Sequence, residues 1–216
     1  MKIGVLISGR GTNLQALLEA AADADFPAEI AIVVSNRPDV QGLERAKNAG
    51  VPAVVIDHKT YRDRTSFEEA LTETLETNEV ELVCLAGFMR LLTATFVDRW
   101  LGRAVNIHPS LLPAFPGLDT HARAIASGAK FAGATVHFLS SGMDEGAIIA
   151  QAATPILPED DAETLAARVL QGEHEIYVRA VRWIAEGRAR LIDGAAILEN
   201  IGDAASCYLP APSGQV

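Results

Sequence analysis

Short apolar runs bounded by turn-forming residues recur along the first half of the chain, and stretches of helical periodicity separate them. This alternation is typical of parallel βαβ units, in which a helix follows each strand and crosses back over the sheet. The sequence therefore predicts an α/β fold with a doubly wound, mostly parallel sheet of Rossmann-like type. Strands are expected at residues 2–8, 29–35, 53–56, 81–86 and 103–108.

The pattern changes after Gly117, where strands and helices no longer alternate regularly. Asp193-Gly194 between two apolar segments predicts a terminal hairpin, because this dipeptide suits a tight turn. Mixed strand directions are therefore expected in the C-terminal half. The elements predicted there are a short helix near 120–127, strands at 134–138 and 148–152, a long helix at 163–187 and the hairpin at 191–198.

Capping signals mark two of the expected helix starts. Ser66 followed by Glu69 resembles a capping box, and Asp160 followed by Glu163 gives a similar signal. No internal repeat or long linker interrupts the chain, so a single domain is expected over residues 1–202. Residues 203–216 contain two prolines and a glycine and are expected to form a disordered tail.

Composition narrows the functional classes. The 216-residue chain carries a net charge of −10, spread along its length, with no basic run interleaved with aromatics. Nucleic-acid binding is therefore not expected. The apolar run at 2–7 is too short for a signal peptide or a membrane span, and Cys84 lies in an apolar run typical of a buried thiol. These features indicate a cytoplasmic protein with no membrane partner.

A glycine-containing loop, ISGRGTNL at residues 7–14, follows the first strand and precedes a helix. Such a loop exposes N–H groups at a helix N-terminus and favours a bound phosphate. A third glycine of the dinucleotide fingerprint is missing near Leu14, and no Gly-Lys-Ser/Thr ending is present. The sequence predicts a mononucleotide-type phosphate site, with a ligand-free structural turn as the alternative.

The strand at 103–108 carries Asn106 and His108, which alternation places on the same face. An amide and an imidazole together suit a developing oxyanion. Pro109 ends the strand at its carboxyl end, where an open α/β sheet binds ligands. Asp144, in a glycine-flanked loop, is expected to reach the same place and to stabilise the imidazolium form of His108. The alternative is that both residues are ordinary hydrogen-bonded groups at a strand end.

At these residues the chain resembles the folate-dependent glycinamide ribonucleotide formyltransferases. The resemblance runs from residue 2 to about residue 192, with its motifs in the same order. The Asn-x-His-Pro strand resembles formyltransferases generally, whereas the first loop and Glu173-His174 resemble the glycinamide-specific branch. The segments that carry the resemblance are SGRGTNL (8–14), GLERA (42–46), AGFMRLL (86–92), NIHPSLLP (106–113), DEG (144–146) and Glu173-His174.

The resemblance implies formyl transfer from 10-formyltetrahydrofolate, as co-substrate, to the amine of 5′-phosphoribosylglycinamide in purine synthesis, by a monomer or homodimer. Leu170 departs from the family, because some relatives carry a polar residue there. The implied catalytic residues are Asn106, His108 and Asp144. The implied substrate-binding residues are Gly11, Thr12, Asn13 and Glu173. The implied folate-binding residues are Arg64, Met89, Arg90, Leu91, Leu92, Asn106, Ser140, Ser141, Gly142, Met143 and Asp144.

Three alternatives remain open. Formyltetrahydrofolate hydrolase shares the Asn-His-Asp machinery but delivers the formyl group to water, and methionyl-tRNA formyltransferase is expected to need a basic tRNA-binding domain. A nucleotide-binding oxidoreductase domain is disfavoured by the missing third glycine and by the absence of an acidic residue after the second strand. The five histidines show no metal-ligand spacing, so no metal is expected. His137 is expected to be a hydrogen-bonded histidine of the core or one behind the site.

Overall fold

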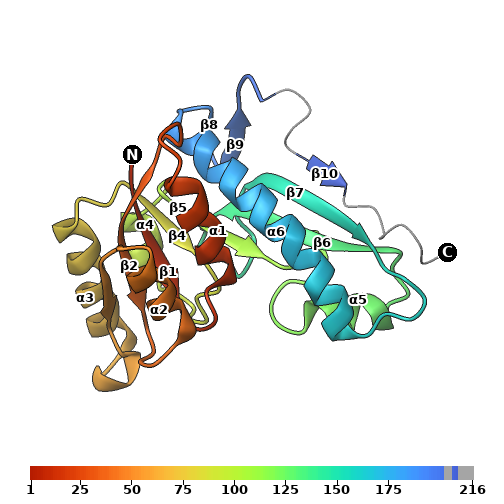
Figure 1. Ribbon diagram of the computed structural model, residues 1–216, viewed down its shortest axis with the longest axis horizontal. Coiled ribbons are helices and arrows are strands. Elements are labelled where there is room, and N and C mark those ends of the chain that lie inside the picture. The colour runs from red at the N-terminus through yellow and green to blue at the C-terminus, as the bar shows by residue number, and fades with distance from the viewer. Residues whose placement is uncertain (202–205, 209–216) are drawn as a thin grey trace.

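An eight-stranded sheet forms the frame of the protein in the computed structural model, which describes residues 1–201 and 206–208 (Figure 1). A separate two-stranded sheet follows the long last helix. The strands are β1 (Lys2–Ile7), β2 (Glu29–Ser35), β3 (Ala53–Val55), β4 (Leu82–Leu85), β5 (Ala104–His108), β6 (Phe131–Phe138), β7 (Ile148–Pro155), β8 (Ala189–Ile192), β9 (Ala195–Leu198) and β10 (Ser206–Tyr208).

The strand order across the main sheet is β10-β7-β6-β5-β4-β1-β2-β3. Strands β1 to β5 are parallel, and β6 pairs antiparallel with both β5 and β7. The chain winds outward from β1 to β3 and then returns to β4 on the other side of β1, which makes the sheet doubly wound. The expected fold class is confirmed, including the mixed strand directions of the C-terminal half.

Helices cover both faces of the sheet (Figure 1). The helix that was expected over residues 163–187 is present within two residues of those bounds, and the Asp193-Gly194 hairpin joins β8 to β9 as expected. The helical segments are α1 (Thr12–Ala21), α2 (Gln41–Asn48), the 3-10 turn η1 (His58–Thr60), α3 (Arg64–Thr77), α4 (Ala94–Arg99), α5 (Thr120–Ala126) and α6 (Ala162–Ala185).

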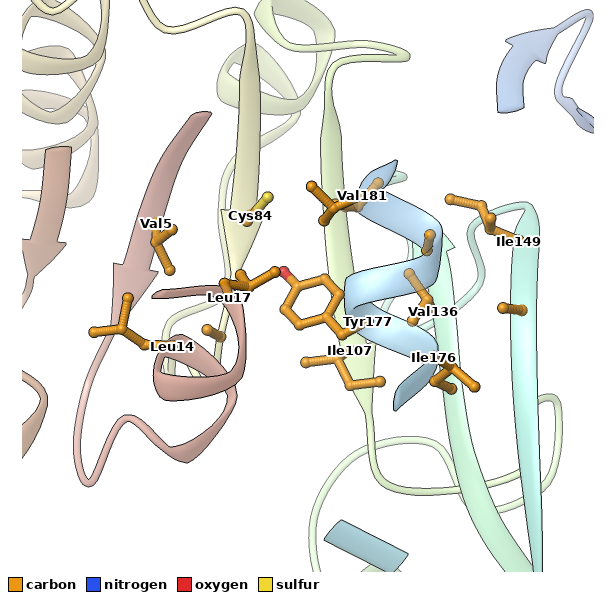
Figure 2. Packing of buried hydrophobic residues seen from close by; sticks show 14 of the residues in the cluster. Val5, Leu14, Leu17, Cys84, Ile107, Val136, Ile149, Ile176, Tyr177 and Val181 are labelled. Carbon is orange, nitrogen blue, oxygen red and sulfur yellow. The ribbon is translucent and has the colours of Figure 1, made fainter. Parts of the chain in front are cut away.

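Two buried apolar clusters, one on each face, hold the layers together. Side chains of α1 and α6 pack against β1, β4, β5, β6 and β7 in the larger cluster, where Tyr177 of α6 is fully buried (Figure 2). Val105 and Ile107 of β5 belong to this cluster. Since side chains alternate along a strand, Asn106 and His108 point away from α6. The packing of β5 thus determines the face on which the polar pair lies.

Both expected capping boxes were placed at the wrong residue. Helix α3 starts two residues before Ser66, because the Asp63 carboxylate accepts the Ser66 N–H at 2.8 Å and caps the helix. Helix α6 is capped by Asp161, one residue after the expected position, and Thr164 completes its capping box. In each case more than one polar residue near the helix start could serve as the cap, and the periodicity of the sequence does not distinguish between them.

The expected tail at 203–216 requires a partial correction. Ser206–Tyr208 form β10 and pair in parallel with residues 151–153 of β7, because the edge of β7 offers free backbone groups. The remaining residues of that segment lie outside the described residues. None of the described helices combines the length and the apolar character needed to cross a membrane.

A buried ion pair fixes the start of α6 and generates a prediction about stability. Arg168 Nη1 donates to Asp160 Oδ1 at 2.8 Å, and this bond is the main cause that lowers the pKa of Asp160 from its ordinary value of 3.8. A lowered pKa stabilises the fold above the ordinary value and loses that effect as the pH falls through it. Arg168→Met should therefore reduce the free energy of unfolding by about 2 kcal/mol near neutral pH.

Urea unfolding from about pH 7 to about pH 3 measures this effect, and the difference from the parent should shrink over the acid end of the range. Arg179→Met is the matched control on the same helix, because Arg179 pairs with Glu175 at the surface, where such pairs contribute little. Equal losses in both variants, or a loss independent of pH, would contradict the assignment.

Candidate active site

His108 and Asp144 meet although they come from different connections of the sheet. The His108 Nδ1 and Asp144 Oδ2 atoms are 3.4 Å apart, and both side chains are largely buried. The connection after β6 leaves the sheet beside the start of β5, where Leu139 N donates to Ala104 O at 2.8 Å. Because β6 is antiparallel to β5, this loop must fold back along β5 to bring Asp144 to the strand's carboxyl end.

Glycine at position 146 allows that return of the chain. A β-carbon there would lie 1.7 Å from the Phe138 carbonyl oxygen and 2.9 Å from His137 Nδ1. Contacts this short do not occur, so only glycine lets the backbone approach β6 so closely. Asp144 itself has a φ of 57°, a left-handed conformation that aspartate tolerates better than most residues.

The second ring nitrogen of His108 faces a backbone carbonyl. His108 Nε2 lies 3.2 Å from the Phe115 carbonyl oxygen, which can only accept a hydrogen bond. Nε2 therefore carries a proton, and Nδ1 is the ring nitrogen that faces Asp144. Gly117 N donates to Asp144 Oδ2 at 2.8 Å, so the same turn of chain holds the carboxylate.

Asn106 lies beside His137, its directly paired neighbour on β6. Asn106 Nδ2 is 3.3 Å from His137 Nε2, and His137 Nδ1 is 2.9 Å from the Phe138 carbonyl. Burial lowers the pKa of His137 despite the opposing effects of the Phe138 carbonyl and Asp144. A neutral ring with its proton on Nδ1 follows, and its Nε2 lone pair accepts from the amide. The second N–H of Asn106 is then free for a ligand.

The glycine-containing loop at residues 7–14 and Glu173 form a second cluster, on the side of α1 and α6. Gly11 has a φ of 70°, and a β-carbon there would lie 2.8 Å from Gly42 Cα. No described side chain caps the N-terminus of α1, so its first N–H groups point outward without a side-chain acceptor. Asn13 Nδ2 donates to Glu173 Oε2 at 2.7 Å, while Asn13 Oδ1 is buried without a partner among the described residues.

The connection after β4, residues 86–93, is held at two points. Met89 N donates to Ser8 Oγ at 2.8 Å, and Ser8 in turn donates to Asn36. At the other end, Thr93 N donates to the buried carboxylate of Glu68 on α3 at 2.9 Å. These hydrogen bonds anchor the backbone of the connection, while its side chains Met89 and Leu91 are exposed. Sequence reasoning missed Ser8, Asn36 and Glu68, since nothing in their spacing marks them.

For some of the remaining predicted residues a nearby contact indicates their position, and for the others only the exposure of the side chain is known. Arg64 precedes Glu68 by four residues, so both lie on the same side of α3, and Glu68 bonds Thr93 at the end of the 86–93 connection. Met143 contacts the region of Gly117, since a β-carbon on Gly117 would lie 3.5 Å from its sulfur. Arg90, Leu92, Ser140 and Gly142 are half-buried, and Ser141 is exposed. The described residues contain no group of three metal-ligating side chains.

This arrangement is that of a doubly wound α/β protein with a ligand site at the carboxyl ends of its central strands. The family model described as "Formyl transferase" matches residues 1–181. Phosphoribosylglycinamide formyltransferase of Haemophilus influenzae is 46% identical over 92% of this chain and 94% of its own length. The chain belongs to the formyl transferase family.

Solved structures agree with this assignment. Glycinamide ribonucleotide transformylase 1 from Symbiobacterium toebii has a TM-score of 0.90 and 48% identity, covering 93% of this chain and 94% of that one. The trifunctional purine biosynthetic protein adenosine-3 of Drosophila melanogaster is 49% identical over 87% of this chain. The chain spans only 14% of the length of that trifunctional relative.

The buried Glu173 carboxyl generates a prediction. Burial is the main cause that raises its pKa above the ordinary 4.5, and the Asn13 bond and the charge of Arg10 oppose it only in part. A raised pKa means that the group stabilises the fold below about pH 4.5 and loses this effect as the pH rises. Glu173→Gln keeps an oxygen acceptor for Asn13 and removes the charge, so it should raise the free energy of unfolding at neutral pH by about 1 to 2 kcal/mol.

Denaturant unfolding of parent and variant at about pH 7.5 and about pH 4 checks the sign, because the gain should vanish at the acid end. A Glu173→Gln variant less stable than the parent at neutral pH would show that the carboxylate is stabilised in the free protein. Such a stability gain on removing a charge is typical of residues kept for a ligand.

Proposed function

We propose that this protein transfers the formyl group of 10-formyltetrahydrofolate to the amine of 5′-phosphoribosylglycinamide, as a cytoplasmic enzyme that acts on small molecules. The family assignment and the names of its full-length relatives support this substrate pair. The observation that carries the proposal is the 3.4 Å approach of Asp144 to His108, with the Asn106 amide next in line on β5.

In the proposed reaction the amine lone pair attacks the formyl carbon, and the carbonyl π electrons move to oxygen, giving a tetrahedral oxyanion. Asn106 donates its free N–H to this oxygen, and the His108 imidazolium, stabilised by Asp144, provides a charged donor from Nδ1. The former amine nitrogen loses one proton, and the departing folate nitrogen gains one as its bond to the formyl carbon breaks. Asp144 and His108 Nδ1 form the relay for this proton.

Binding of the ribotide follows from the second cluster. The N–H groups of Gly11, Thr12 and Asn13 at the start of α1 are suited to the phosphate, against the unfavourable field of a chain with net charge −10. Glu173 is proposed to bind the ribose or the glycinamide amine. The buried Asn13 Oδ1 next to it lacks a protein partner among the described residues, which supports a ligand there. Leu170, half-buried on α6, adds no polar group to the phosphate.

The folate is proposed to bind between the two connections that flank β5. Met89, Leu91 and Met143 expose apolar surface there, which suits a pterin ring. Arg64 and Arg90 are proposed to bind the glutamate carboxylates, because a guanidinium group can bind a carboxylate with two parallel hydrogen bonds. Residues 140–144 and Leu92 complete this proposed site.

The catalytic assignment predicts large losses on removing either donor. His108→Ala and Asn106→Ala should each lower kcat for formyl transfer by roughly 10²–10³-fold, because each removes one hydrogen bond to the oxyanion. A spectrophotometric assay with 10-formyltetrahydrofolate and 5′-phosphoribosylglycinamide measures both variants. Activity within a few-fold of the parent in either variant would refute the assignment.

The same assay separates a transferase from a formyltetrahydrofolate hydrolase. Formyl release should depend on added 5′-phosphoribosylglycinamide and should yield one formylated ribotide for each folate released. Release at the same rate without the ribotide would identify water as the acceptor and would overturn the proposed substrate pair. Arg179→Gln is a suitable control, since Arg179 pairs with Glu175 at the surface of α6 and is assigned no role in the reaction.

A further inference from the structure

Arg123 of α5 holds the turn that precedes this helix. Its Nη1 atom donates to the carbonyl oxygens of Pro116 at 2.5 Å and Leu118 at 3.1 Å. Its guanidinium carbon lies 5.6 Å from the centre of the Phe115 ring, within the range of a cation–π contact. Arg123 thus ties the first turn of α5 to the backbone carbonyls of the preceding segment.

The turn that Arg123 holds, residues 115–118, touches both His108 and Asp144. The Phe115 carbonyl faces His108 Nε2, and Gly117 N donates to Asp144 Oδ2. Phe115 has a φ of 54°, a left-handed conformation that is unfavourable for a bulky residue. Strained backbone of this kind persists only where surrounding contacts hold it in place. Arg123 contacts the ring of this residue and the carbonyl oxygens of Pro116 and Leu118, which follow it.

We propose that Arg123 is a positioning residue for the reaction, acting through the 115–118 turn on His108 and Asp144. The proposal rests on the catalytic role proposed above for that pair. With the turn held, the Phe115 carbonyl keeps a proton on His108 Nε2, and the exchangeable proton stays on Nδ1, beside Asp144. Without the contacts of Arg123, the Phe115 carbonyl moves away from Nε2, and the neutral His108 ring can carry its proton on either nitrogen.

Two variants and one matched control test this role. Arg123→Gln removes the charge and at least one of the two hydrogen bonds to carbonyl oxygens. Arg123→Lys retains a cation that can donate to one carbonyl. Arg103→Gln is the control, because Arg103 also donates to a backbone carbonyl, that of Arg99, and lies 4.8 Å over the Trp100 ring. Arg103 precedes β5, at the end of the strand opposite to His108.

Arg123→Gln should lower kcat by about tenfold with KM for both substrates within about twofold, because a misplaced catalytic group affects the transition state rather than binding. Arg123→Lys should recover part of this loss, and Arg103→Gln should match the parent. Imidazole ¹⁵N spectra at alkaline pH, with the His108 signals identified by their loss in His108→Asn, should show the Nε2–H form in the parent and a mixture of both forms in Arg123→Gln.

Parental kcat and parental His108 spectra in Arg123→Gln would overturn the proposal, as would an equal fall in kcat for Arg103→Gln. If Arg123→Gln fails to fold, the same two readouts on Arg123→Lys decide the question. The spectra require no turnover, so they separate failure of this proposal from failure of the proposed function. In the latter case His108→Ala would retain activity whatever the spectra show.

Discussion

The approach of Asp144 to His108 is the interaction on which the arrangement of the site depends, because it joins two connections that the sheet alone would keep apart. Strand β6 runs antiparallel to β5, so the loop bearing Asp144 starts beside Ala104 and must return along the strand. The close packing of Gly146 against β6 makes the return possible. The 109–118 connection then closes over both groups from the other side. The order of the strands thus determines which loops can meet.

Burial shifts the pKa values of titratable groups in both clusters, and the direction of the shift depends on the kind of group. It raises the pKa of Glu173 and lowers the pKa of His137, so it favours the neutral form of each. A neutral His137 accepts a hydrogen bond from Asn106. Because the protein alone disfavours the charged form of Glu173, a cationic or hydroxyl-bearing ligand could stabilise its carboxylate. In a chain with net charge −10, the proposed site for an anionic substrate then relies on backbone N–H groups as donors rather than on basic side chains.

The sequence was sufficient for the fold class, since apolar periodicity reports directly on strands buried between two helical layers. It was also sufficient to bring Asn106, His108 and Asp144 together, because alternation and the family motifs restrict them strongly. It did not predict the exact helix starts, where Asp63 and Asp161 are the N-cap residues. It also did not predict β10, whose pairing depends on the available edge of β7. It also missed the contacts of Ser8, Asn36, Glu68 and Arg123, because these hydrogen bonds join segments that only the tertiary fold brings together.

Two backbone carbonyls give the two histidines of the site opposite roles. The Phe138 carbonyl faces Nδ1 of His137, so that ring keeps its proton there and presents a lone pair on Nε2 to Asn106. The Phe115 carbonyl faces Nε2 of His108, so that ring presents Nδ1 to Asp144 instead. In the proposed reaction, the amide held by one ring and the proton carried by the other act on the same oxygen. Because a carbonyl can only accept, the path of the main chain, more than the side chains themselves, determines which histidine donates and which accepts.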